Sequence, residues 1–413
     1  MKILWGEMRR YWQPLLLVLC GVLTAFFCLF VNQSAQRFGT YFRGQSYALT
    51  RDFYERFGTT LDRAERAQIV SESDALSAEF DGLFDKYLGK YDIHSETDYD
   101  LLTLAANDET DEQYDEAAAR WGAENLVSLH ETCEAMIHEK IDTMYYKDRM
   151  NVFFAWTRHF TIFDEIVEEY RTTGTVEMGF EGTSQQVDHK ALAPLLADLD
   201  KDEISLLTVI NQADTFRETY LIWALLLFLL CALLTAPLLV TNRIRNIQPL
   251  QFASRQGKSM IFRQITAALL SSALVNIAAD FIFYRVFFCG AYDTRFLLDC
   301  PINAGTLGEM YRLNLTYGQF VLLSFVNVLV LSLLLTGTVL AASYYCKNYI
   351  SAIAVSTVLT ILGWFWCQKL FRYGRIYHSY RLPFPVVAVL PTVVVLAAVM
   401  FLLVKVRQSD YTE

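Results

Sequence analysis

The sequence lacks the cysteine arrangements that identify zinc-ribbon and thiol-redox proteins. Its eight cysteines are scattered along 413 residues, and no two of them are separated by only two residues. Zinc ribbons and thioredoxin-like sites both depend on such close pairs, so neither is encoded here. Four cysteines lie in apolar runs, where we expect them to pack as small hydrophobic side chains: Cys20, Cys28, Cys231 and Cys367.

A nucleotide-binding loop is also missing. Gly257, Lys258 and Ser259 match the end of a phosphate-binding P-loop, which requires another glycine five residues before Gly257 and a preceding strand. Phe252 occupies that position, and an apolar run comes before the segment. We therefore expect no nucleotide site, no cofactor and no catalytic residue in this chain.

The HExxH pattern of metalloproteases is absent as well. His130, Glu134 and His138 stand at i, i+4 and i+8 of an expected helix and so share one face. The two histidines would lie about 12 Å apart along the helix axis, too far to share one ion without another element. We interpret the three residues as a solvated helix face, with zinc binding as the alternative.

Charge is divided unevenly along the chain. Residues 32–218 contain 38 acidic and 17 basic residues, a net charge of −21, and the rest contains 7 acidic and 18 basic residues, a net charge of +11. An acidic region of this size argues against nucleic-acid binding, which depends on neutralising phosphates with basic side chains.

The pattern of the acidic region predicts a mainly helical soluble domain. It contains few glycines and one proline, Pro194, and its apolar residues recur at three- and four-residue steps. The pattern predicts paired helices between residues 111 and 171 and a strand or hairpin at 175–180. From Lys201 a helical pattern runs into the next apolar run.

Six apolar runs are long enough to cross a hydrocarbon core of about 30 Å. The predicted spans cover residues 13–31, 219–240, 265–288, 320–344, 349–368 and 386–404. The first run is too long for a secretory signal and lacks an A-x-A-like end, so we expect it to be retained. The predicted fold is an all-α integral membrane protein of about six transmembrane helices with a large extracellular domain, residues 32–218, between the first and second.

Basic residues orient these spans. Lys2, Arg9 and Arg10 precede the first span, which predicts a cytoplasmic N-terminus with a lead-in helix at 1–12. Six spans then return the C-terminus to the cytoplasm, with a tail at 405–413, in a protein that we expect in the plasma membrane. The connections at 289–319 and 369–385 then form outer loops. The second of these carries four basic residues against the positive-inside bias, so five spans remain the alternative.

Polar residues in and beside the third span are candidate functional groups. Asn276 and Asp280 are one turn apart within it. An intramembrane carboxyl group is costly, so a substrate or proton role stands beside the alternatives of structural pairing or contact with outer water. Cys289 and Cys300 flank an expected outer loop, where an oxidising compartment permits a disulfide, and we keep that disulfide as a hypothesis.

The segment between the second and third spans, residues 241–264, is basic and contains no acidic residue. Short basic loops beside membrane spans stay in the cytoplasm. Pro249 suits the first turn of a helix that continues to Phe262. Such a helix would be amphipathic and held at the membrane surface, where it can contact lipid or dock on a soluble partner. Its expected interface residues are Pro249, Leu250, Ala253, Arg255, Gly257, Lys258 and Ile261.

The order of a first span, a large outer domain, a second span, a basic loop and four further spans resembles the permeases of type-2 ABC exporters, especially Gram-positive ones. The stretch from Pro249 to Lys258 is similar to that family's S-x-R-x-G-R/K-like segment. The resemblance implies that this loop couples to a separate ATPase chain, which binds ATP and magnesium. It also implies a homodimer or paired permease that exports a substrate. A drug, a peptide, a lipid and an ion all remain open as that substrate.

Two other functions fit the same layout. An ATPase-driven mechanotransmission protein would move its outer domain to regulate an extracellular enzyme without transport. A membrane-anchored sensor would bind a ligand through that domain. Six spans favour transport, because the other two functions need fewer.

Overall fold

The computed structural model of the chain is predominantly helical and divides into two compact units. The first, here called the membrane unit, comprises residues 1–38, 177–200 and 204–413, and the second, the acidic unit, comprises residues 39–176 and 201–203. The structure describes residues 6, 8, 12–35, 43–107, 113–173, 177–180, 183–186, 200–209, 212–244, 257–304 and 314–373.

Five helices in the described part of the membrane unit are long and apolar enough to cross a membrane. They are α2 (Pro14–Ala35), α11 (Gln212–Ile244), α13 (Gly257–Phe288), α14 (Tyr317–Tyr345) and α15 (Tyr349–Tyr373). Five of the six predicted spans are therefore confirmed as helices. The sixth, 386–404, and the tail at 405–413 lie outside the described residues, as does most of the lead-in segment 1–12.

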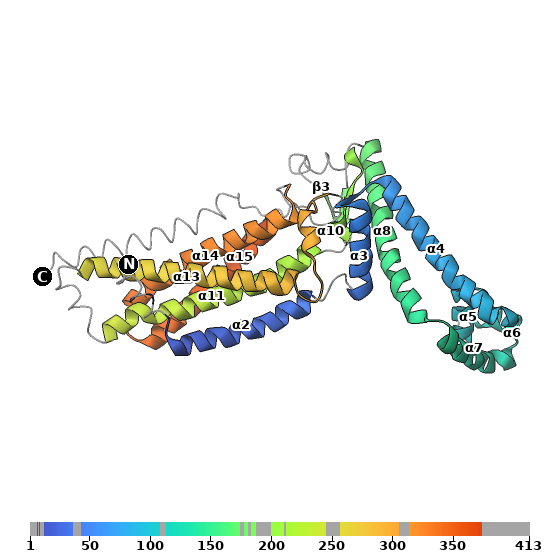
Figure 1. Cartoon of the computed structure of the whole chain (residues 1–413), viewed down its shortest axis with the longest axis horizontal. Coiled ribbons are helices and arrows are strands. Elements are labelled where there is room, and N and C mark those ends of the chain that lie inside the picture. The colour runs from blue at the N-terminus through green and yellow to red at the C-terminus, as the bar shows by residue number, and fades with distance from the viewer. Residues whose placement is uncertain are drawn as a thin grey trace. The chain divides into compact units, whose positions relative to one another are not determined.

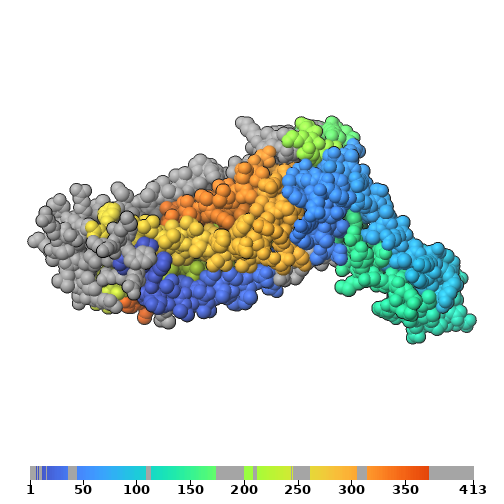
Figure 2. Space-filling model, viewed as in Figure 1, coloured from blue at the N-terminus to red at the C-terminus, as the bar shows by residue number. Residues whose placement is uncertain are grey.

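Helix α11 is the centre of this bundle, because it packs against α2, α13, α14 and α15 (Figure 1). Its Tyr220, Trp223 and Phe228 are fully buried. Helix α2, by contrast, exposes Val18 and Phe26, and the space-filling view shows it as a continuous strip beside α13 (Figure 2). A helix that exposes apolar side chains over most of its length requires a hydrocarbon environment, so the bundle is membrane-embedded.

The connection after α13 folds onto the start of α14. It contains the short helix η3 (Arg295–Asp299), and an isolated bridge pairs Pro301 with Thr316. The Thr316 side chain accepts a hydrogen bond from the Gln319 backbone while Gln319 bonds back to the Thr316 N–H, a capping box that fixes the first turn of α14. The connection is therefore ordered where it is described.

Short strands lie between the two units in the sequence. The strand or hairpin predicted at 175–180 is confirmed as the strand β2 (Glu177–Phe180), which pairs antiparallel with β3 (Thr183–Gln186), beyond the predicted range. The helix predicted to run from Lys201 into the second span is wrong over its first part, because β4 (Ile204–Ser205) and α10 (Leu206–Val209) precede α11. These segments group with the membrane unit rather than with the domain predicted over 32–218.

The acidic unit is helical, as predicted. Its helices are α3 (Arg43–Phe57), α4 (Arg63–Leu88), α5 (Glu96–Asn107), α6 (Tyr114–Trp121), α7 (Leu126–Lys140) and α8 (Thr143–Thr173), with the two-residue strand β1 (Thr60–Leu61) and single turns η1 (Gly89–Tyr91) and η2 (Ala123–Asn125). Helices α4 and α8 run side by side, and α5, α6 and α7 gather at one end of the pair (Figure 1). A capping box between Asp62 and Glu65 starts α4.

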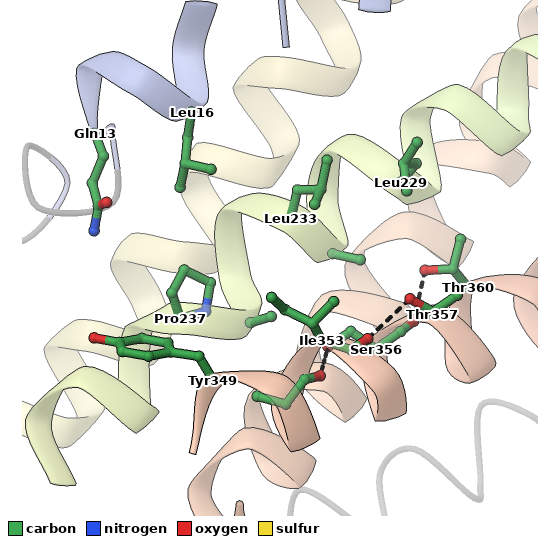
Figure 3. Close-up of a pocket in the computed structure, with 13 residues that line it drawn as sticks. Gln13, Leu16, Leu229, Leu233, Pro237, Tyr349, Ile353, Ser356, Thr357 and Thr360 are labelled. Atoms are coloured by element: carbon green, nitrogen blue, oxygen red, sulfur yellow. Dashed lines mark hydrogen bonds between the residues drawn. The ribbon is translucent and has the colours of Figure 1, made fainter. Parts of the chain in front are cut away.

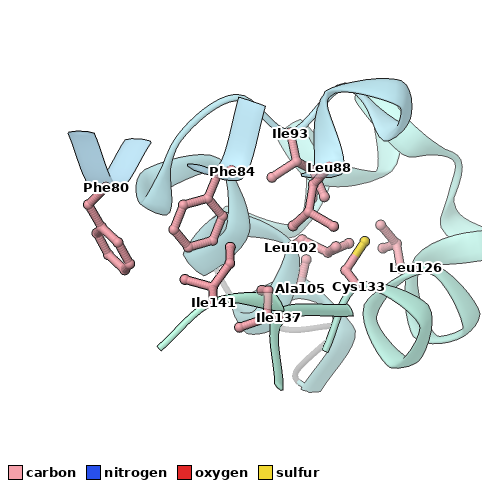
Figure 4. Close-up of a cluster of buried hydrophobic side chains, with 11 residues drawn as sticks. Phe80, Phe84, Leu88, Ile93, Leu102, Ala105, Leu126, Cys133, Ile137 and Ile141 are labelled. Carbon is pink, nitrogen blue, oxygen red and sulfur yellow. The ribbon is translucent and has the colours of Figure 1, made fainter. Parts of the chain in front are cut away.

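The end of the α4–α8 pair at which α5, α6 and α7 gather contains a compact apolar core (Figure 4). Phe80 and Phe84 meet edge to face with ring centroids 5.0 Å apart, and Phe80 also stacks on Tyr146 of α8 at 5.0 Å. Leu102 of α5 and Ile137 of α7 pack into the same cluster. The core holds α5 and α7 against the long pair, because full burial of each such side chain contributes about 1.5–3 kcal/mol.

At the other end of the pair, a buried arginine joins three segments. Arg66 of α4 is 2% exposed, and its guanidinium donates to Asp164 Oδ1 at 2.7 Å and to Asp202 Oδ1 and O, each at 2.8 Å. It also donates to the Leu61 carbonyl at 3.2 Å and lies over the Phe163 ring at 5.1 Å. A buried guanidinium needs this degree of pairing, so these contacts fix residues 201–203 against α4 and α8.

The turn after η1 is closed by a histidine between two aspartates. His94 Nδ1 lies 2.5 Å from Asp85 Oδ1, and His94 Nε2 lies 3.4 Å from Asp92 Oδ1. The hydrogen bond with Asp85, helped by Asp92, raises the pKa of His94 above its ordinary value. Arg120 bonds the backbone and side chain of Asp92, which adds a link from α6 to the same turn.

This pairing predicts a pH-dependent turn. Because the folded-state pKa of His94 lies above the unfolded value of about 6.5, folding takes up protons. The stabilisation should be fully present below about pH 6.5 and should disappear as pH rises through the folded-state pKa. Hydrogen exchange at residues 89–98, corrected for intrinsic rates, should show this protection, and His94→Gln should remove its pH dependence.

The exposed histidine of α7 supplies the matched control. His138→Gln changes a side chain that is 77% exposed and should leave the protection profile of residues 89–98 unchanged. An unchanged profile in His94→Gln would contradict the role assigned to this histidine.

Candidate functional site

The candidate functional site is a group of hydrogen-bonded polar side chains inside the membrane bundle. Asn276 of α13 is fully buried and donates to the Ser272 carbonyl at 2.8 Å and to Cys231 Sγ of α11 at 3.1 Å. Ser332 of α14 donates to Asn276 Oδ1 at 2.8 Å, and Thr336 Oγ1 lies 3.0 Å from Ser272 Oγ. One asparagine thus connects three transmembrane helices.

A second polar contact lies about three turns before Cys231 on α11. The fully buried Tyr220 hydroxyl donates to Asp280 Oδ1 at 3.1 Å, and Asp280 is 7% exposed. The indole of Trp223 lies beside the same carboxyl group without the geometry of a hydrogen bond. Aromatic rings surround this contact, with Phe283 and Phe325 each 5.1 Å from the Tyr220 ring. The carboxyl group is therefore held in an apolar, closely packed environment.

The sequence identified the two polar residues of α13 but not their partners. The structure pairs Asp280 with Tyr220, rather than opening it to outer water. Ser272, Asn276 and Asp280 recur every four residues, a spacing that places them on one helical face and is visible in the sequence. The partners on α11 carry no such signal, because tyrosine and cysteine are ordinary in an apolar span.

Both polar contacts can hold helices in register and can also respond to movement. In hydrocarbon an unpaired polar group has no water to bond, so each partner on α11 or α14 restricts how far α13 can slide. A sliding movement must exchange these bonds for others. The two contacts therefore resist sliding of α13 against α11 and α14.

The hypothesis of a disulfide between Cys289 and Cys300 is not supported by the structure, in which both are free thiols. Cys300 is fully buried within the connection after α13, and burial raises its pKa to about 12. The thiolate needed for disulfide formation is scarce at neutral pH under these conditions. Position in an outer loop was therefore too weak a basis for pairing them.

The proposed interface residues of the basic segment are only partly described. Pro249, Leu250, Ala253 and Arg255 lie outside the described residues. Gly257, Lys258 and Ile261 belong to α13, so this end of the predicted surface helix is continuous with the third span. Ile261 is 4% exposed and packs into the bundle, whereas the neighbouring Phe262 is 59% exposed.

Of the three residues weighed as a zinc site, His130 packs on an aromatic ring, and His138 and Glu134 lie near each other. His130 stacks on the Tyr99 ring with centroids 5.9 Å apart. His138 Nε2 lies 3.9 Å from Glu134 Oε1, and both of these side chains are more than half exposed. The contacts match a helix face that is partly solvated and partly packed.

The bond between Tyr220 and Asp280 predicts a specific pattern of stabilities. Tyr220→Phe should lower the free energy of unfolding by about 1–3 kcal/mol, because Asp280 stays buried without this donor. Adding Asp280→Leu should restore part of the loss, since replacing both partners by apolar groups removes the unpaired group. Thermal unfolding of the purified protein in mild detergent measures both effects.

Tyr284→Phe is the matched control, because its contact with the Phe288 ring survives removal of the hydroxyl. That variant should unfold close to the wild-type temperature. Purely additive losses in the double variant would show that Tyr220 and Asp280 do not act as a pair.

Comparison with known proteins finds no relative for this chain. No family model matches it, no curated protein matches it, and no solved structure matches it.

Proposed function

We propose that the chain is the membrane-spanning permease subunit of an ABC exporter. It would move a drug-, peptide- or lipid-like substrate outward with energy from ATP hydrolysed by a separate ATPase subunit. In this proposal the acidic unit is extracellular, both termini are cytoplasmic, and the protein resides in the plasma membrane. A homodimer or a pair of permeases binds two ATPase chains, which hold the ATP and magnesium.

The observation that carries the proposal is the basic segment between α11 and α13. It contains Arg243, Arg245, Arg255, Lys258 and Arg263 and no acidic residue, which favours a cytoplasmic position. The resemblance to type-2 permeases rests on the same segment and on the order of spans around it. A positive surface at this position is suited to carboxylates on a soluble partner.

The geometry of α13 supplies a route for movement. The helix begins at Gly257, within the basic segment, and continues without a break to Phe288. Asn276 lies about 28 Å along the same axis and bonds to α11 and α14. A displacement of the ATPase would therefore act on a rigid helix whose hydrogen bonds join it to its neighbours. Closing of the ATPase dimer on ATP would rock the spans in this way.

A mechanotransmission protein is the second candidate, because the acidic unit contains an unusually long helix pair. Helix α4 has 26 residues and α8 has 31, so they extend about 39 and 46 Å. Such a pair, with a compact core at its end, is suited to carrying movement toward an extracellular enzyme. ATP-driven accumulation of substrate in sealed vesicles distinguishes export from mechanotransmission.

The coupling role predicts the effect of a bulky residue at the start of α13. The Gly257→Trp variant should insert normally into the membrane but should no longer co-purify with the ATPase, because the indole obstructs close approach of the ATPase to this helix. Stimulated ATP hydrolysis should be lost with the partner. Arg255→Glu combined with Lys258→Glu should weaken the same association, with a dependence on salt concentration. Affinity purification from native membranes, followed by an ATPase assay, measures both.

Gly21→Trp is the control, since a side chain at Gly21 on α2 meets open space. That variant should retain the ATPase. If Gly257→Trp also kept both the partner and its hydrolysis, the basic segment would not be the coupling site.

A further inference from the structure

The membrane unit contains an apolar cavity of about 220 Å³ between α2, α11 and α15. Leu16 of α2 forms one wall, Leu229 and Leu233 of α11 form a second, and Ile353 of α15 forms a third (Figure 3). Pockets for drug-sized molecules usually measure about 300–1,000 Å³. This volume is suited to a slender apolar group rather than a whole drug-sized ligand.

Small residues and inward-bonded hydroxyl groups create the space. Ala232 and Ala236 of α11 line the cavity together with Ala352 of α15. The hydroxyls of Ser356 and Thr357 donate to the carbonyls of Ala352 and Ile353 at 2.7 and 2.9 Å. Because these hydroxyls are committed to their own helix, the wall that α15 presents is mostly hydrocarbon.

Polar groups gather at one end of the cavity. Figure 3 shows Pro237 and Tyr349 at this end and Thr360 at the other. The Tyr349 hydroxyl lies 3.0 Å from Thr241 Oγ1, and Gln13 lines the same region. Proline has no N–H, so the Leu233 carbonyl one turn before Pro237 lacks its usual helical donor. The cavity is therefore amphipathic along its length.

The chain around this polar end is positively charged. Lys347 is exposed two residues before Tyr349, and the sequence places Arg243 and Arg245 shortly after Pro237. Residues 219–279 and 310–409 contain no acidic residue. Clusters of lysine and arginine next to membrane spans attract anionic lipids.

We propose that this cavity binds one acyl chain of an anionic phospholipid, whose headgroup lies at the end marked by Tyr349 and Lys347. The apolar walls accept the hydrocarbon chain, and the positive charge selects the headgroup. The lipid belongs to the leaflet next to the basic segment and bridges α2 to α15 across α11. The inference does not depend on the proposed export function.

Two tryptophan variants on α15 test this site. Thr357 lines the cavity and is exposed, so Thr357→Trp should fill the space. Val358 is the next residue, is 56% exposed and does not line the cavity, so Val358→Trp is the matched control. Each protein is reconstituted with phosphatidylglycerol or with phosphatidylcholine of the same acyl chains, extracted in mild detergent and weighed by native mass spectrometry.

The expected result is that wild type and Val358→Trp retain one phosphatidylglycerol that Thr357→Trp loses. Phosphatidylcholine should be retained less in every case, and Lys347→Gln should reduce the preference for phosphatidylglycerol. As a second measurement, added phosphatidylglycerol should raise the melting temperature of wild type but not of Thr357→Trp. Equal retention by both tryptophan variants, or equal retention of the two lipids by wild type, would overturn the proposal.

Discussion

The membrane unit depends on one constraint, which is that polar groups in hydrocarbon must bond to one another. Asn276 forms hydrogen bonds with α11 and α14, and Asp280 accepts a hydrogen bond from Tyr220. These contacts determine which face of α13 turns inward, because apolar packing alone distinguishes poorly between faces that are all apolar. Helices α11, α13 and α14 are thereby held in rotation and in register.

The acidic unit satisfies its polar groups differently, because it is solvated. Arg66 is the exception, since it is buried and needs four hydrogen bonds to Leu61, Asp164 and Asp202. Most other ion pairs there are exposed, such as Arg51 with Glu55, and contribute little because water and salt screen them. Hydrophobic burial around Phe80 and Phe84 supplies the larger part of the stability. The two units of this chain are therefore stabilised differently, the membrane unit by hydrogen bonds between buried polar groups and the acidic unit mainly by hydrophobic burial.

The sequence predicted the features that depend on local pattern and missed those that depend on tertiary contact. Run length located the five described spans, and alternation located the strand β2 but not its partner β3. Tyr220 was not predicted as the partner of Asp280, because the two are 60 residues apart and only packing joins them. The strand β4 and helix α10 interrupt a helical pattern that local propensity alone extends to Lys201. The hypothesis of a disulfide at Cys300 rested on position in the sequence, whereas the burial of this cysteine is a tertiary property.

The central claim is a membrane protein with its acidic unit outside and its basic segment inside. Single cysteines in a background without native cysteines test it most directly. Ser71→Cys lies on an exposed part of α4, and Gly257→Cys lies at the start of α13. A membrane-impermeant maleimide should label Ser71→Cys in intact cells and should label Gly257→Cys only after permeabilisation. Labelling of Gly257→Cys in intact cells, or protection of Ser71→Cys, would contradict the account.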